Sequence, residues 1–181
     1  METLFDIGAI PTVTCANDRS EWYTPPDKVE PARRTMGHID LDPASCHFAN
    51  TLVKATTYLT RETDGFSREW WGNVWCNPPY SDYGGQAADW CEKALREYLA
   101  GRAEQCVLLV NLDQFGQEKI QETARHGLTC IHRGRIAFID ANGNQQSSPR
   151  YNNLYIYLGK NGAAFIREFS PLGIVQSVAG N

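Results

Sequence analysis

The feature that most constrains the fold is the segment 106–111, whose sequence CVLLVN is apolar up to its last residue. An uninterrupted apolar strand of this kind is typical of a sheet that is covered on both faces. The preceding residues 87–99 place apolar side chains three and four positions apart, which predicts an amphipathic helix. Together the two segments predict a layered α/β protein.

The rest of the chain alternates between segments typical of strands and of helices. Four further segments are predicted to contribute short strands: 38–45, 51–59, 73–81 and 128–132. A second helix is predicted at 117–126, where a glycine follows it. We expect a three-layer α/β sheet that is mostly parallel.

The antiparallel part of this sheet is expected near the C-terminus. Residues 135–140 and 153–159 alternate apolar and polar positions, and the polar loop between them holds an Asn-Gly turn signal. This pattern predicts a long hairpin at the edge of the sheet.

Length and hydrophobicity suit one compact domain, because 181 residues with 42% hydrophobic side chains can bury a sizeable core. We expect a single domain over 21–181, preceded by an N-terminal arm at 1–20. No stretch approaches the roughly 20 apolar residues of a membrane span, and no basic segment precedes an apolar run at the start. These features predict a cytoplasmic protein.

The cysteines and histidines show no spacing typical of a metal site. The six cysteines form no CxxC pair, and the four histidines form neither HxH nor HExxH. Cys76, Cys106 and Cys130 lie in or beside apolar runs, where a reduced thiol packs as a small hydrophobe. We therefore expect no bound metal, which argues against a metal-dependent nuclease or hydrolase.

The net charge of −4 argues against a protein that coats DNA, because such binding neutralises many phosphates. Any contact with DNA must be local. Arg133, Arg135 and Arg150 gather around the polar loop 141–150, which makes them candidate phosphate contacts. Solvated surface charge on a flexible loop is the alternative interpretation.

The strongest chemical signal is Asn77-Pro78-Pro79-Tyr80, which follows a predicted strand. In α/β sheets, ligands bind in the crevice outside the carboxyl ends of the strands. An aromatic amino group is a poor nucleophile, because its lone pair is delocalised into the ring. Two acceptors, the Asn77 side-chain oxygen and the Pro78 main-chain oxygen, can localise that pair on the nitrogen.

The neighbouring residues suit the same chemistry. The two prolines fix φ and so hold the Pro78 carbonyl in place. Tyr80 is expected to stack on a base that has been flipped out of a duplex or is already single-stranded. A simple strand-ending turn is the alternative interpretation of this tetrapeptide.

Several further segments accompany the tetrapeptide in a fixed order: WYTPP at 22–26, DLDPAS at 40–45, Asp64-Gly65-Phe66, VWCNPPYS at 74–81 and GRIAF at 134–138. In these motifs the chain resembles the bacteriophage DNA N6-adenine methyltransferases, a Dam-like group of S-adenosylmethionine-dependent enzymes, over roughly residues 20–160. The resemblance implies a Rossmann-like methyltransferase sheet, S-adenosylmethionine as cofactor, and DNA as partner inside a bacterial host cell. Protection of a viral genome from host restriction is its implied role.

The resemblance also implies which residues bind the cofactor. They are Tyr23, Thr24 and Pro25 at its methionine end, Asp42, Pro43 and Ala44 near its ammonium group, Asp64 and Phe66 at its adenine, and Asn50 at its ribose. Asp42 before a proline is equally typical of a helix N-cap, and Asp64-Gly65 of a turn. The segment after Asp42 lacks the glycine-rich loop of many methyltransferases.

Two aromatic residues, Phe138 and Tyr151, flank the polar loop and are candidate contacts of the target base, although strand aromatics are often core. The same catalytic tetrapeptide also suits cytosine N4, an adenine in RNA, or a protein glutamine amide. A non-catalytic binding protein that kept the fold is a further alternative.

Overall fold

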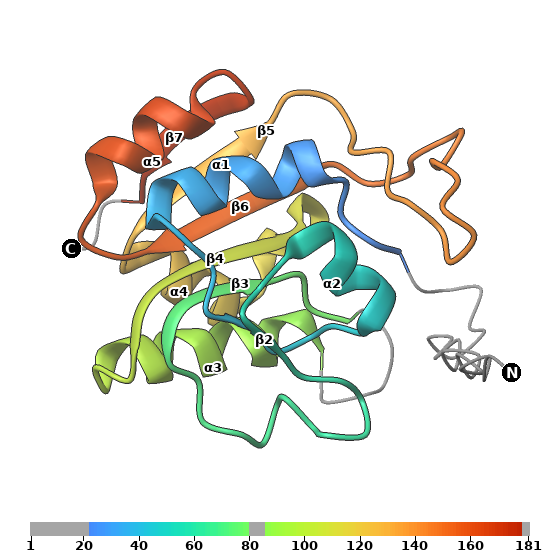
Figure 1. Ribbon diagram of the computed structural model, residues 1–181. Coiled ribbons are helices and arrows are strands. Elements are labelled where there is room, and N and C mark those ends of the chain that lie inside the picture. The colour runs from blue at the N-terminus through green and yellow to red at the C-terminus, as the bar shows by residue number, and fades with distance from the viewer. Residues whose placement is uncertain (1–21, 80–85, 179–181) are drawn as a thin grey trace, which may run out of the picture.

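The computed structural model describes residues 22–79 and 86–178, so the predicted arm at 1–20 and Tyr80 lie outside the described residues (Figure 1). Over these ranges the chain forms a seven-stranded sheet of order β2-β1-β3-β4-β6-β5-β7. The strands are β1 (Leu41–Asp42), β2 (Thr57–Tyr58), β3 (Gly72–Cys76), β4 (Ala103–Asn111), β5 (Leu128–His132), β6 (Asn153–Leu158) and β7 (Gly173–Ser177).

The sheet is parallel through β2, β1, β3 and β4, and antiparallel where β6 lies between β4 and β5. The edge strand β7 is antiparallel to β5. This arrangement confirms the expected Rossmann-like sheet with antiparallel strands towards one edge. It also places the carboxyl ends of β1, β3 and β4 side by side, because neighbouring parallel strands end at the same edge.

Helices cover both faces of this sheet (Figure 1). The α-helices are α1 (Pro26–Met36), α2 (His47–Val53), α3 (Ala87–Leu99), α4 (Glu118–Arg125) and α5 (Gly162–Phe169), and η1 (Leu112–Gly116) is a 3-10 helix. Helices α3 and α4 pack on one face, and α1 and α5 on the other. The amphipathic stripe that predicted α3 is the buried side of that helix, where Trp90, Cys91 and Ala94 are fully enclosed.

The covered part of β4, residues 106–110, shows why this segment is apolar throughout. Cys106, Leu108 and Val110 enter the core beneath α3 and α4, whereas Val107 and Leu109 enter the core beneath α1 and α5. A strand with both faces covered has no position left for a polar side chain. Cys106 is a free, buried cysteine, as are Cys76 and Cys130, which agrees with the expected core role of these thiols.

Two segments differ from the expected elements. Residues 51–59 form the end of α2 and the short β2 rather than one strand, because Lys54 adopts a left-handed conformation (φ 55°) that ends the helix. Residues 135–140 form no strand of the sheet: Ile139 makes isolated bridges to Tyr23 and Gln145. The predicted edge hairpin is therefore wrong, because β6 pairs with β4 and β5 and lies inside the sheet.

Helix α1 contains two prolines, a residue type that usually favours extended or turn backbone. Pro26 occupies the first turn, where a missing N–H costs nothing. Pro31 is tolerated inside the helix, where Val29 and Ala32 anchor this helix in the core. Within the described residues, no helix is long and apolar enough to cross a membrane.

The turn at residues 60–67 packs directly against the residue that follows β1. The Trp70 indole N–H donates to the Gly65 carbonyl at 2.8 Å, and Trp70 itself is fully buried. A Cβ at Gly65 would lie 1.9 Å from the Pro43 carbonyl oxygen. Gly65 is therefore required by close packing of two backbone segments.

We expect Gly65→Ala to lower the free energy of unfolding by about 1–3 kcal/mol, because backbone must shift to admit the methyl group. Chemical denaturation measures this change. Gly116→Ala is the matched control, since nothing lies within 4 Å of its would-be Cβ, and it should change stability by less than about 0.5 kcal/mol. Equal stability of the two variants would contradict the packing argument.

Candidate functional site

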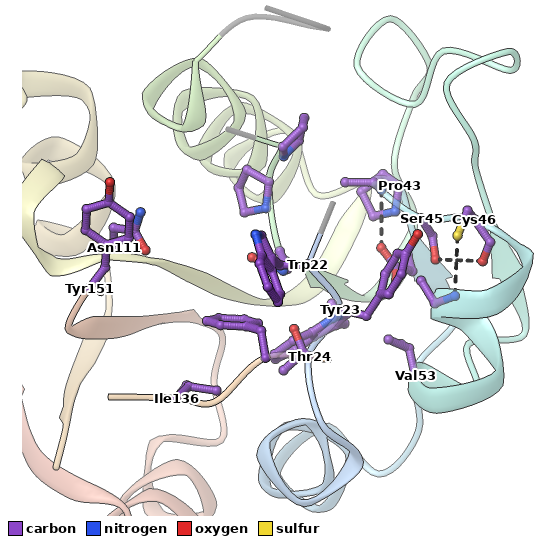
Figure 2. A pocket seen from close by; sticks show the side chains of 18 of the residues that line it. Trp22, Tyr23, Thr24, Pro43, Ser45, Cys46, Val53, Asn111, Ile136 and Tyr151 are labelled. Carbon is purple, nitrogen blue, oxygen red and sulfur yellow. Dashed lines mark hydrogen bonds between the residues drawn. The ribbon is translucent and has the colours of Figure 1, made fainter. Parts of the chain in front are cut away.

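A cavity of about 740 Å³ opens at the carboxyl ends of β1, β3 and β4 (Figure 2). Each of these strands leads into the cavity wall: Pro43 follows β1, Asn77 follows β3, and Asn111 ends β4. Figure 2 shows Pro43, Ser45 and Cys46 at one end of the cavity, and Asn111 and Tyr151 at the other. The segment 22–24 lies between the two ends.

The predicted catalytic segment lies in this wall. Asn77, Pro78 and Pro79 line the cavity, whereas Tyr80 lies outside the described residues. The side-chain oxygen of Asn77 is buried and has no hydrogen-bond partner in the described ranges. A buried acceptor without a hydrogen-bond partner lowers the stability of the fold. This oxygen is therefore placed to receive a hydrogen bond from a ligand N–H or O–H group.

The N-terminal segment contributes a second unmet polar atom. Tyr23 exchanges two backbone hydrogen bonds with Ile139, at 2.8 and 2.9 Å, and its ring packs edge-on against Phe48. This pairing holds Thr24 in the cavity wall, where it is 3% exposed. Its hydroxyl has no hydrogen-bond partner within the part of the chain that the structure describes. Pro25 does not line the cavity and is the N-cap residue of α1.

Asp42 supplies the buried acidic group of the site. It ends β1, lines the cavity with Pro43 and Ala44, and is 2% exposed. Burial raises the pKa of this carboxyl to about 7, although hydrogen bonds from Ser45 and from the Ala44 N–H lower it. The alternative role as a helix N-cap belongs instead to Cys46, whose Sγ accepts from the Ala49 N–H. Asp42 therefore titrates near neutral pH beside the cavity.

The remaining predicted cofactor residues lie outside the cavity wall. Asn50 hydrogen-bonds the Ala55 backbone through both ends of its amide, at 2.9 and 3.2 Å, and so closes the turn after α2. Asp64 has φ 52° and accepts from the Ser67 N–H in a turn. Phe66 packs against Trp90, with ring centroids 5.3 Å apart. These contacts give all three residues a structural role.

Some of the predicted substrate residues line the cavity and others do not. Phe138, Arg150 and Tyr151 line the cavity, and Tyr151 is 51% exposed. Arg133 and Arg135 are exposed and do not line it. Arg135 donates to the Pro149 carbonyl at 3.4 Å, which connects it to the loop that carries Arg150.

Sequence reasoning missed a group of residues on the far side of the cavity. Asn111, Asp113 and Gln114, from the end of β4 and from η1, line it, as does Trp22. The signal for Asn111 was available, because it is the polar end of a predicted buried strand. Gln114 Oε1 is also buried without a hydrogen-bond partner in the residues described.

These unmet atoms set the site apart from the rest of the core. The buried side-chain atoms that lack a partner in the described ranges are Thr24 Oγ1, Asn77 Oδ1, Gln114 Oε1 and Trp90 Nε1. The first three belong to residues that line the cavity. The three atoms in the cavity wall suit hydrogen bonding to a polar ligand. Within residues 22–79 and 86–178, no group of three or more His, Cys, Asp or Glu side chains is placed to hold a metal ion.

Comparison with known proteins identifies the family. The model of the family described as DNA N-6-adenine-methyltransferase (Dam) matches residues 11–171. A search of curated proteins finds no match. Because the family match spans most of the sequence and includes the cavity-lining segments, the chain belongs to the DNA N-6-adenine-methyltransferase (Dam) family.

Proposed function

We propose that this chain transfers the methyl group of S-adenosylmethionine to N6 of a DNA adenine that is flipped out of the duplex or is single-stranded. The observation that carries the proposal is the buried, unpartnered Asn77 oxygen at the end of β3, within a cavity at the carboxyl edge of the sheet. Membership of the Dam family supports DNA adenine as the substrate.

The residues of the cavity fit the cofactor. S-adenosylmethionine supplies an electrophilic methyl group on a positively charged sulfur. A carboxylate at Asp42 suits the cationic groups of this molecule, and the unmet Thr24 hydroxyl suits its carboxylate. The cavity volume of about 740 Å³ lies within the range of small-molecule sites.

Asn77 and Pro78 act on the target amine. The Asn77 side-chain oxygen and the Pro78 carbonyl each accept one N–H of the amine, which turns its lone pair out of conjugation with the ring. As the new N–C bond would form, the methyl–sulfur bond would break and leave a neutral thioether, and the two oxygens would stabilise the positive charge that develops on the nitrogen until one of its protons is lost to solvent. The proline rings keep the Pro78 carbonyl fixed, so little reorganisation is needed.

Entry of the target base into the cavity is assigned to aromatic and basic residues in and beside the cavity wall. A base inside a duplex is not accessible, so it must leave the stack to reach the cavity. Phe138 and Tyr151 offer aromatic surface in the cavity wall, and Tyr80 is proposed to stack on the base as well. Arg150 lines the cavity, and Arg133 and Arg135 lie exposed on the adjoining segment, which suits local contact with phosphates.

Expression in a methylation-free bacterial strain tests the function directly. We expect N6-methyladenine in the DNA by nucleoside mass spectrometry, and modification-sensitive sequencing then maps the target site. N4-methylcytosine in its place, or labelled methyl groups found only in RNA or protein, would assign the same chemistry to another amino group and overturn the adenine proposal.

Asn77→Ala should lower the rate of methyl transfer at least about a hundredfold, the scale expected on losing one preorganised polar group. Labelled-methyl transfer to DNA measures the rate, and calorimetry should show nearly unchanged affinity for S-adenosylmethionine. Asn77→Asp is the matched variant, since it keeps an acceptor oxygen, and it should retain more activity than Asn77→Ala. Wild-type activity in Asn77→Ala would refute the mechanism.

The raised pKa of Asp42 predicts that cofactor binding depends on pH. Its carboxyl is partly protonated near pH 7 in the free protein, and a bound cation favours the ionised form, so binding releases a proton. Affinity should therefore rise as pH increases from about 6 to about 8. Calorimetry in buffers of different ionisation enthalpy measures the released proton. Asp42→Asn should bind more weakly and release none, and an unchanged pH profile in that variant would contradict the assignment.

A further inference from the structure

The polar segment between β5 and β6 contains a short hairpin at residues 138–146, to which the methyl-transfer scheme assigns no sequence-reading task. The Gln146 N–H donates to the Phe138 carbonyl at 2.8 Å, and Ile139 forms an antiparallel bridge with Gln145. In Figure 1 this 138–146 hairpin, drawn in orange, extends away from the sheet and its covering helices. It is therefore a narrow, two-stranded projection from the body of the protein.

The turn of the 138–146 hairpin is held by one carboxylate. Asp140 Oδ1 accepts from the backbone N–H groups of Asn142 and Asn144, both at 2.9 Å, and Asn144 Nδ2 donates to Asp140 Oδ2 at 3.4 Å. Gly143 has a φ of 83°, and its N–H donates to the Asp140 carbonyl at 3.0 Å. The turn thus has a defined shape before a partner binds, which lowers the entropy cost of binding.

One side of the 138–146 hairpin belongs to the cavity wall. Phe138 and Gln146 line the cavity, and the backbone pairing of Ile139 with Tyr23 holds the hairpin in place. Successive side chains of an extended segment point to opposite sides. Gln145, next to Gln146, accordingly does not line the cavity and is exposed. Because the DNA backbone joins a base in the cavity to its neighbours, the flanking nucleotides must lie just outside the cavity, beside the hairpin.

The charge around the 138–146 hairpin is positive, although the net charge of the protein is −4. Residues 133–150 contain three arginines, all of them exposed, and the single acidic residue Asp140. The exposed turn itself, residues 141–145, carries no charged side chain. Arginines beside the hairpin suit DNA phosphates, whereas an uncharged polar turn suits the edges of base pairs.

The shape and the side chains of the 138–146 hairpin match the major groove of DNA. This groove admits a two-stranded β-ribbon, and each base pair presents a distinct pattern of donors and acceptors there. A glutamine amide can donate to N7 of adenine and accept from its N6 amine at the same time. Gln145 suits this contact, because its side chain is exposed and takes no part in the hydrogen bonds that hold the turn.

We propose that the 138–146 hairpin enters the major groove beside the target adenine, where the Gln145 amide reads an A·T pair that flanks the target. This inference rests on the proposed function. The amide donates to N7 of the flanking adenine and accepts from its N6 amine. The arginines of residues 133–150 contact phosphates, which fixes the position of the hairpin on the duplex without selecting a sequence. Gln145 is thereby a specificity-determining residue that contacts the substrate outside the cavity.

The test compares substrates that differ only in the pairs that flank the target. After the target site has been mapped, kcat/KM is measured on oligonucleotides in which each flanking pair is replaced in turn. The wild type should lose roughly tenfold to a hundredfold in kcat/KM when one particular flanking A·T pair is replaced. It should lose about threefold to tenfold when the adenine of that pair is 7-deazaadenine, which pairs normally but lacks N7. Gln145→Ala should show neither loss, while it keeps the wild-type preference at every other position.

A second glutamine provides the matched control. Gln176 is exposed on the edge strand β7 and does not line the cavity, so Gln176→Ala should behave as the wild type. Calorimetry should show unchanged affinity for S-adenosylmethionine in both variants, which verifies that the cavity is intact.

The possible outcomes separate this inference from the function on which it rests. An unchanged flanking preference in Gln145→Ala, or an equal 7-deazaadenine penalty in this variant and the wild type, would overturn the inference alone. An equal loss of rate by Gln145→Ala on every substrate would also overturn it, since a residue that reads a base acts at one position. A wild type that methylates adenine regardless of its flanking pairs would overturn the inference and leave the proposed function standing. A wild type that methylates no DNA would overturn the proposed function as well.

Discussion

The end of β3 is the constraint on which the rest of the site depends. Pro78 and Pro79 have no N–H to donate, so the strand cannot continue in the sheet beyond Cys76. The chain is therefore released at the carboxyl edge, where β1 and β4 also end. Asn77 remains there with its oxygen buried and unmet by the described residues, and the prolines restrict the motion of the neighbouring carbonyl. A sheet that stops at this point produces both the cavity and the acceptors that face it.

Burial gives the two ends of the cavity different chemistry. At one end, removal from water raises the pKa of Asp42 to about 7, so its charge responds to a bound cation. Elsewhere in the cavity wall, the side-chain oxygens of Asn77 and Gln114 have no hydrogen-bond partner in the described part of the chain, so hydrogen bonding to a molecule that carries N–H or O–H groups is favoured there. Under the proposed function, a positively charged methyl donor suits the surroundings of Asp42. A base that carries an amine suits the surroundings of Asn77. The segment 22–24, held by the backbone pairing of Tyr23 with Ile139, lies between the two ends of the cavity.

Local sequence patterns correctly predicted the helices and strands in which a whole face of the element is buried. The bounds of α3 and β5 agree with the expected segments, because a helical stripe and a short apolar run each report a complete face of burial. The pattern at 51–59 was misleading, since residues 51–53 complete α2 and the left-handed Lys54 separates them from β2. Residues 135–140 alternate like a strand, yet only Ile139 forms bridges. Alternation indicates that one side is covered but does not show which partner covers it.

The sequence by itself determined the family, the layered sheet and the placement of Asn77-Pro78-Pro79 at a strand end, because these follow from short-range patterns and from the fixed φ of proline. It also indicated Thr24 and Asp42, which line the cavity. Only the tertiary structure showed that Asn50, Asp64 and Phe66 are engaged in local contacts, and that Asn111 and Gln114 line the cavity. Whether a polar side chain faces a ligand or a neighbour depends on which distant segments fold against it. That pairing is decided by the packing of the whole sheet and cannot be inferred from the residues on either side.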